Sequence, residues 1–220
     1  MKRIGIAALS AASLLAAGTA AAVEPQWNYG QIGWIQGDGL ENDGESDGFK
    51  VDASIGFLEN YHFQLSYEDG TFDDYFNDTD WDGYNATLGF HQAISASGNT
   101  QIIANINYFD IDFDEDGGEG YGSTTDGYGL GFGLRSMISE RVELEGMINW
   151  IKGNWDPDWS SNDEDYTDTS LKVGGRYHWM PNVSTGITLS INGNGSTGSF
   201  YGGDTALIDV RYSFGSDISK

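Results

Sequence analysis

The feature that most constrains the fold is an alternation of apolar and polar residues that recurs along most of the chain. In residues 49–57 (FKVDASIGF) every second side chain is apolar, and residues 127–135 and 169–179 repeat the pattern. Alternation with a period of two places successive side chains on opposite faces of a β-strand, and no comparable helical periodicity follows residue 22. The pattern predicts ten strands, with eight as the alternative: 27–36, 49–57, 61–68, 81–91, 100–110, 127–135, 142–152, 169–179, 183–192 and 205–214.

The connections between these strands alternate between short and long. The short ones are 58–60, 95–98, 139–141 and 180–182, and the long ones are 37–47, 69–80, 111–126, 153–168 and 193–204. Short turns on one rim and long loops on the other are typical of outer-membrane barrels, with the turns in the periplasm and the loops outside the cell. Closing the sheet also removes its edges, as hydrocarbon requires. We therefore expect an all-β fold, a closed antiparallel transmembrane β-barrel that forms one domain, residues 23–220. The alternative is a soluble barrel or sandwich whose apolar face points inward.

The first 22 residues have the composition of a secretory signal peptide. Lys2 and Arg3 form a basic start, residues 4–17 are almost wholly apolar, and small residues run to Ala22 with Ala20 in the A-x-A position. This order predicts cleavage before Val23 and export across the inner membrane to the cell outer membrane.

Aromatic residues gather near both ends of the apolar face, as expected where rings meet a membrane–water interface. Near the long loops the sequence predicts a girdle of Trp34, Phe49, Tyr67, Tyr84, Tyr108, Tyr128 and Trp150. Near the short turns it predicts a second girdle of Phe57, Tyr61, Phe90, Tyr177, Trp179, Tyr212 and Phe214. Two girdles around an aliphatic belt favour the lipid-facing orientation over the soluble alternative.

The opposite face must then line the lumen, and it carries charges of both signs. The predicted charge layer consists of Lys50, Asp52, Glu68, Arg135, Glu143, Glu145, Lys172, Arg176, Asp209 and Arg211. Counting from the turn at Glu140 places Arg135 opposite Glu145, and counting across the next loop places Arg176 on the other side of Glu145. Such a layer could be a plug of paired charges in a narrow barrel or a selectivity constriction, and the plug is favoured because small barrels fill their interiors. Four alternating glycines, from Gly127 to Gly133, are expected to leave room for bulky neighbours such as Arg135 or Met137, or to let the wall bend sharply.

The long connections are strongly acidic. They hold 24 of the 34 acidic residues, if Asp110 is counted with them, and no Lys or Arg. With a formal net charge of -24, nucleic acid is excluded as a partner. Asp112, Asp114 and Asp116 resemble half of a calcium loop, but Ser123 stands where the closing Glu would be. Loosely bound divalent cations that bridge lipopolysaccharide phosphates are one interpretation, and a solvated surface suited to a salty medium is the other.

No catalytic constellation is found. The chain has no cysteine, and its three histidines, His62, His91 and His178, are predicted near the short turns, away from the loops where barrel enzymes hold their catalytic groups. An omptin-like protease or a lipid A deacylase is therefore not expected, and no cofactor is implied.

Several stretches resemble the small OmpA-like or porin-family outer-membrane β-barrel proteins of Gram-negative bacteria. They are GYGLGFGLRSM (127–137), VELEG (142–146), LKVGGRYHW (171–179) and the closing DVRYSF (209–214). The resemblance implies that Tyr212 and Phe214 form the aromatic signal of the last strand for the barrel-assembly machinery, although residues 215–220 follow it. It also implies contact with outer-membrane lipid and lipopolysaccharide. We expect a monomeric, non-enzymatic structural or surface-interaction protein with a largely filled lumen, or alternatively a small passive porin-like channel for polar or cationic solutes.

Overall fold

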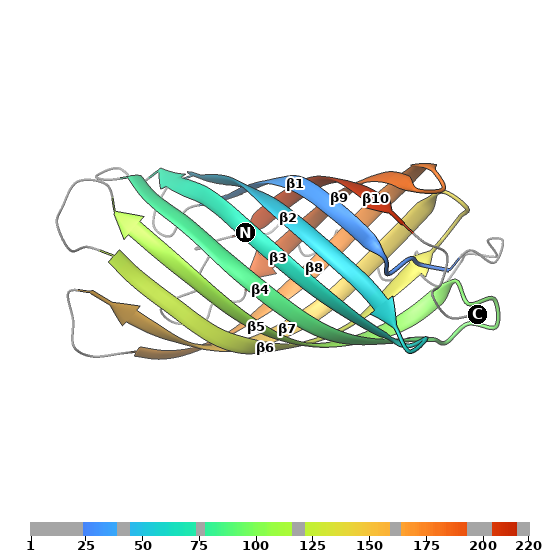
Figure 1. Ribbon diagram of the computed structural model, residues 1–220, viewed down its shortest axis with the longest axis horizontal. Coiled ribbons are helices and arrows are strands. Elements are labelled where there is room, and N and C mark those ends of the chain that lie inside the picture. Colours follow the sequence, from blue (N-terminus) through green and yellow to red (C-terminus); the bar gives the residue numbers. More distant parts are fainter. Residues whose placement is uncertain are drawn as a thin grey trace, which may run out of the picture.

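The computed structural model describes residues 24–38, 45–73, 78–115, 122–158, 164–192 and 204–214. They form ten β-strands (Figure 1). The strands are Tyr29–Asp38 (β1), Glu45–Phe57 (β2), Tyr61–Asp73 (β3), Asp78–Ala93 (β4), Thr100–Glu115 (β5), Gly122–Met137 (β6), Val142–Pro157 (β7), Glu164–Met180 (β8), Val183–Asn192 (β9) and Thr205–Ser213 (β10). Among these residues, no helix is long and apolar enough to span a membrane.

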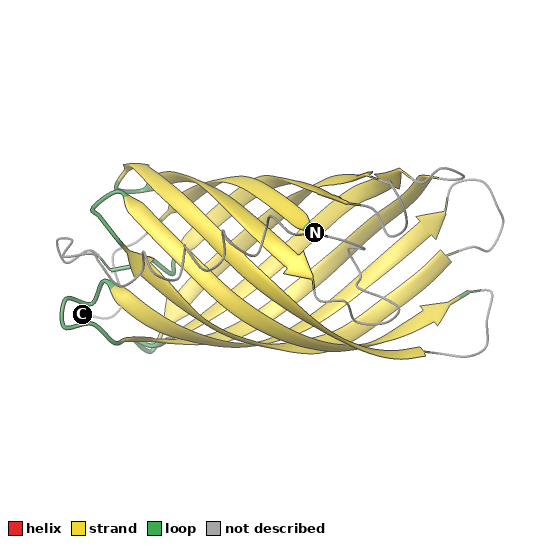
Figure 2. Ribbon diagram, turned by 180° about the vertical axis from the view of Figure 1, so that it is seen from behind, coloured by secondary structure: helices red, strands yellow, loops and turns green. Residues whose placement is uncertain are grey.

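The strands close into a single barrel. Each strand pairs antiparallel with its neighbours in sequence, and β1 pairs with β10 from Tyr29↔Ser213 to Gly37↔Thr205 (Figure 2). The prediction of a closed antiparallel barrel with ten strands, rather than eight, is confirmed. In the ladders between described residues, the register shifts only between His178 and Met180.

The four short connections lie at one end of the barrel, which we call the short-turn end; the opposite end is the long-loop end. Tyr29, the first residue of β1, pairs with both Ser54 and Ser213, so the chain enters and leaves the barrel at the short-turn end. In the turn between β2 and β3, Leu58 and Glu59 adopt φ of 49° and 58°. Positive φ at two successive residues suits the twist of an antiparallel hairpin.

At the long-loop end the strands extend further than the sequence predicts. Much of the expected loops 69–80, 111–126 and 153–168 belongs to strands, because β3 reaches Asp73, β5 reaches Glu115 and β8 begins at Glu164. The predicted boundaries are therefore wrong there, and many carboxylates assigned to loops lie on the barrel wall. Residues 39–44, 74–77, 116–121, 159–163 and 193–203, as well as the expected signal peptide 1–22, lie outside the described residues.

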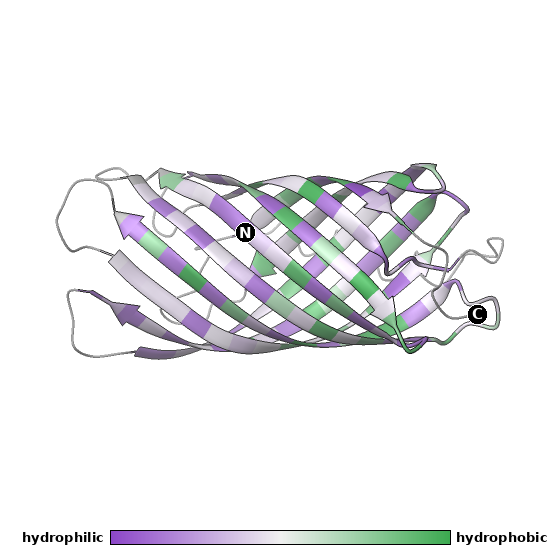
Figure 3. Cartoon of the chain, in the orientation of Figure 1, coloured by the Kyte–Doolittle hydropathy of each residue, from purple (hydrophilic) through white to green (hydrophobic). Residues whose placement is uncertain are grey.

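Polar and apolar residues alternate along the strands (Figure 3), and many large apolar side chains are exposed on the outer wall. Leu130 and Phe132 of β6 point outward and are 50% and 63% exposed, whereas the intervening Gly131 is buried. All fourteen predicted girdle aromatics lie on this wall, and none is buried. An exposed belt of this kind is stable against acyl chains and costly in water, as in a transmembrane barrel.

Beyond the girdle of the long-loop end, the polarity of the two faces is reversed. On β5, Asp110, Asp112 and Asp114 face outward, whereas Phe109, Ile111 and Phe113 face inward and are buried. The wall there meets water and headgroups, where carboxylates are solvated, and the enclosed interior takes the apolar side chains. In its membrane belt the barrel therefore exposes apolar side chains and encloses polar ones. Beyond the girdle of the long-loop end it does the reverse.

Candidate functional site in the barrel lumen

A compact group of charged side chains fills the lumen near the short-turn end. We call it the charge cluster; it consists of Arg135, Glu143, Arg176, Asp209 and Arg211, and all five are at most 8% exposed. Glu143 is its centre: its carboxylate receives a hydrogen bond of 3.0 Å from Arg135 Nη2 and lies 3.8 Å from Arg176 Nε and 3.7 Å from Arg211 Nη1. One carboxylate shared by three guanidinium groups offsets part of the desolvation cost of all four.

The predicted pairing around Glu145 is partly wrong. The register places Arg135 opposite Glu145, as expected, but it places Arg176 opposite Glu143. Arg135 Nε lies 3.8 Å from Glu145, whose side chain remains 36% exposed. The error of two residues arises because strands β7 and β8 extend into the region counted as a loop.

Four further contacts complete the charge cluster. Arg176 Nη2 lies 2.6 Å from Asp209 Oδ1, and both Arg176 and Arg211 donate hydrogen bonds to Gln31 Oε1, at 3.2 and 2.8 Å. The guanidinium carbon of Arg211 also lies 3.8 Å from the centre of the Tyr29 ring. Strands β1, β6, β7, β8 and β10 are therefore joined across the interior, as well as through the wall.

The remaining members of the predicted charge layer lie nearer the middle of the lumen. Lys50 Nζ contacts Glu68 and lies 3.7 Å from Asp52 Oδ1, and Asp52 Oδ1 accepts a 2.6 Å hydrogen bond from Ser66. Lys172 lines the same space, and the structure gives it no ion pair with any described residue. The middle of the lumen is therefore polar but less tightly paired than the charge cluster.

The segment that precedes β1 enters the barrel at the short-turn end, which the sequence did not predict. Trp27 was assigned to the first strand, but its ring lies in the lumen, stacked on His62 and His91 with centroid distances of 4.0 and 4.4 Å. Its Nε1 donates a 2.9 Å hydrogen bond to Gln101, and the Arg135 guanidinium lies 4.6 Å from its ring centre. Trp27 and the charge cluster therefore meet inside the same end of the barrel, through the contact of Arg135 with the Trp27 ring.

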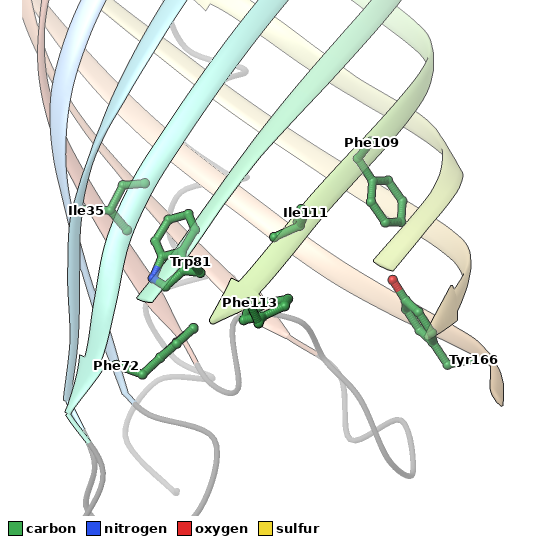
Figure 4. Packing of buried hydrophobic residues seen from close by; sticks show 7 residues of the cluster. All are labelled: Ile35, Phe72, Trp81, Phe109, Ile111, Phe113 and Tyr166. Atoms are coloured by element: carbon green, nitrogen blue, oxygen red, sulfur yellow. The ribbon is translucent and has the colours of Figure 1, made fainter. Parts of the chain in front are cut away.

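A cavity of about 300 Å³ occupies the lumen, and its lining begins at Trp27 and Arg135 near the short-turn end. Toward the long-loop end it is lined by Ile35, Phe109, Ile111 and Tyr166. These four belong to the apolar cluster, which comprises Ile35, Phe72, Trp81, Phe109, Ile111, Phe113 and Tyr166 (Figure 4). The sequence pattern did not predict this group, because the whole inward face was expected to be polar. The signal was present in residues 109–113 (FDIDF), where the alternation continues with its polarity reversed.

Strand β6 makes room in the lumen by presenting glycine to it. A Cβ at Gly127 would lie 2.6 Å from the Phe109 ring, and a Cβ at Gly129 would lie 2.5 Å from the amide oxygen of Asn107. The glycines therefore leave room for larger neighbouring side chains, as expected, but at Gly127 and Gly129 these come from β5 and are not Arg135 or Met137.

The three histidines lie near the short-turn end, and His178 Nε2 is 3.7 Å from Glu143. Asp112 and Asp114 are exposed on the outer face of β5, while Asp116 lies outside the described residues. In the described parts of the chain, no three His, Cys, Asp or Glu side chains converge as a metal site, so the divalent-cation site stays a prediction. Tyr212 and Phe214 lie at the end of β10 on the outer wall, where their rings are about half exposed.

No family model matches the sequence, and no curated protein matches it significantly. Among solved structures, the chain is similar to the translocator domain of the autotransporter NalP from Neisseria meningitidis, with a TM-score of 0.53 and 14% identity over 96% of this chain and 94% of that one. The COG4313 outer membrane channel from Pseudomonas putida F1 matches with a TM-score of 0.46 and 10% identity, over 90% of this chain and 99% of that one. The KdgM porin matches with a TM-score of 0.41 and 13% identity, over 84% and 99%. The similarity to the NalP translocator shows that this chain has the fold of an outer-membrane β-barrel.

Proposed function

We propose that this protein is a monomeric, non-enzymatic barrel of the outer membrane whose lumen does not conduct, and that it acts at the cell surface in a structural or surface-interaction role. The observation that carries the proposal is the group of buried side chains packed inside the short-turn end, which on this proposal closes the lumen. There, Trp27 stacks on two histidines while Glu143 holds three arginines together. Removing one partner of a buried, multiply paired group is costly, so this closure resists opening.

The rest of the molecule fits the same proposal. The long-loop end faces the cell exterior, and the short-turn end, where β1 begins and β10 ends, faces the periplasm. The exposed carboxylates of the wall, such as Asp112, then lie at the level of lipid and lipopolysaccharide headgroups, where divalent cations could neutralise both. Insertion depends on the barrel-assembly machinery and on the outward-facing Tyr212 and Phe214. No catalytic role is assigned, because the three histidines lie at the end opposite the long loops.

The second candidate is a small passive channel for polar or cationic solutes. The cavity of about 300 Å³ and the acidic wall around its outer end favour it. The two candidates differ in whether the closure at Trp27 opens.

Single-channel recording in planar bilayers tests the proposal. We expect the wild-type protein to give no steady conductance steps. Substitution of both Trp27 and Arg135 by Ala removes the ring and the guanidinium that covers it, and should produce measurable steps. Steady steps of appreciable conductance from the wild type would overturn the proposal and establish the channel.

A further inference from the structure

One buried carboxylate in the lumen has no cation beside it. Asp168 points inward from β8 opposite Ile151, lines the cavity, and is 8% exposed. Its Oδ1 accepts a 2.6 Å hydrogen bond from the backbone N–H of Thr169. No described Lys, Arg or His lies within ion-pair distance of Asp168, in contrast to Glu143.

The surrounding sequence cannot supply a cation either. Lys152 points outward and pairs with the exposed Asp165 at 3.6 Å. Lys172 faces the lumen four residues further along β8, which places the two Cα atoms about 13 Å apart. Residues 39–44, 74–77, 116–121, 159–163 and 193–203, which connect the strands at this end, contain no Lys or Arg. A buried carboxylate without a cationic partner is costly, and among the described residues none offsets the charge of Asp168, which leaves it available to a cation from outside the chain.

Toward the long-loop end, the neighbours of Asp168 are aromatic and aliphatic. Tyr166 is the next inward residue on the same strand, and it belongs with Phe109 to the apolar cluster that lines the cavity (Figure 4). The faces of aromatic rings carry negative charge density and attract cations, most strongly where water is excluded. A carboxylate beside aromatic rings therefore suits an ammonium group that carries hydrocarbon.

The outer end of the barrel also favours cations over anions. Carboxylates such as Asp82, Asp110 and Asp126 ring the wall, and no basic residue occurs in the connections. A surface of one charge sign raises the local concentration of counter-ions of the opposite sign. The cavity volume of about 300 Å³ is at the lower end of the range for small-molecule sites.

We propose that the outer half of the lumen is a binding site for a small organic cation with an apolar body, an alkyl- or arylammonium ion. The ammonium group lies against Asp168, and its hydrocarbon packs on the apolar cluster beside Phe109 and Tyr166. A bare metal ion fits less well, because among the described residues Asp168 belongs to no group of three or more His, Cys, Asp or Glu side chains that could hold one. The inference goes beyond the proposed function: a lumen that is closed at Trp27 can bind this ligand from the exterior without transporting it.

Titration calorimetry with benzyltrimethylammonium chloride tests the site. The full-length protein, purified in a non-ionic detergent and in phosphate buffer, is compared with Asp168→Asn and with the matched control Asp165→Asn. Both variants lose one negative charge from β8, one inside the lumen and one on the outer wall. We expect saturable 1:1 binding to the wild type and the control, and at least about a tenfold weaker affinity in Asp168→Asn, which corresponds to about 1.4 kcal/mol. Phe109→Leu should also weaken binding, and benzenesulfonate should not bind.

The free protein supplies a second readout. Because Asp168 is an uncompensated charge, Asp168→Asn should melt at the same or a higher temperature than the wild type without ligand, and only the wild type should be stabilised by benzyltrimethylammonium. Equal affinity of Asp168→Asn and wild type, no saturable binding, or a lower melting temperature of Asp168→Asn would each overturn the proposal. The conductance result does not bear on this test, so the two proposals can fail separately.

Discussion

At the scale of single residues, the barrel holds carboxylates in three different environments. Glu143 is buried among three guanidinium groups, Asp168 is buried without a cation, and Asp112 is exposed on the outer wall. The free energy of burying a charge depends on which groups replace its hydrating water molecules. The same functional group is therefore structural at Glu143 and available to a ligand at Asp168.

Substitution of Glu143 by Gln should lower the free energy of unfolding by about 3–5 kcal/mol, the usual cost of breaking a buried ion pair by removing one partner. Three guanidinium groups would lose their shared carboxylate. Urea-induced unfolding in lipid vesicles, followed by tryptophan fluorescence, measures the change. The exposed pair of Lys152 with Asp165 provides the control, and Asp165→Asn should change stability by less than about 1 kcal/mol. Similar losses in both variants would contradict the central role of Glu143.

The sequence predicts which residues face inward but not which of them meet. Parity places all ten members of the charge layer on the inner face, because the side-chain period of a strand is two. The partner of Arg176 depends on the residue count across the connection between β7 and β8, where strand and loop cannot be separated by pattern. The position of Trp27 is not predicted for another reason. Trp27 precedes β1, and only the three-dimensional structure of the closed barrel shows that its side chain lies in the lumen.

At the scale of elements, β6 is unusual because five successive inward positions, from Thr125 to Gly133, carry one small residue and then four glycines. Without side chains of its own, β6 lets the inward side chains of β5 and β7 lie against its backbone. A larger residue on β6 would collide with those neighbours or with the facing backbone.

Gly133→Ala should destabilise the barrel by about 1–3 kcal/mol, as overpacking of an interior does. The new Cβ would contact the carbonyl oxygen of Gly146 and Met147 Cα, which are backbone atoms that cannot move aside cheaply. Gly146→Ala is the matched control, since nothing lies within 4 Å of the added atom. The thermal unfolding of the two variants in detergent should therefore differ clearly, and equal stability would refute the packing argument.

The strand ends at the long-loop end illustrate how a pattern can mislead. Residues 109–114 (FDIDFD) alternate as regularly as residues of the membrane belt, but apolar and acidic residues have exchanged faces. The high charge of this stretch suggests a loop. Its period of two indicates a strand instead, one that extends beyond the hydrocarbon layer. The inward apolar residues of this strand form part of the apolar cluster.

At the scale of the whole molecule, the fold depends on the pairing of its first and last strands. β10 forms continuous ladders with β1 and with β9, and it also contributes Asp209 and Arg211 to the charge cluster. Loss of this strand would leave two open edges, whose unpaired N–H and C=O groups are not tolerated in hydrocarbon.

Deletion of residues 206–220 should abolish membrane insertion, whereas deletion of residues 215–220 should not. Heat-modifiable mobility in electrophoresis and protease resistance in vesicles report the inserted barrel. Normal insertion of the longer deletion would refute the requirement for β10. Failure of the shorter one would assign part of the assembly signal to residues beyond Phe214.

The exchange of faces above the aromatic girdle also fixes how deep the barrel can sit. Tyr84 and Tyr108 are followed on the outer wall, one rung higher, by Asp82 and Asp110. If the barrel moved deeper by this one step, the carboxylates next to the girdle would enter the acyl chains. The free-energy cost of such a move rises with depth. A thicker bilayer must therefore thin locally around this protein, because the barrel cannot shift its position along the membrane normal.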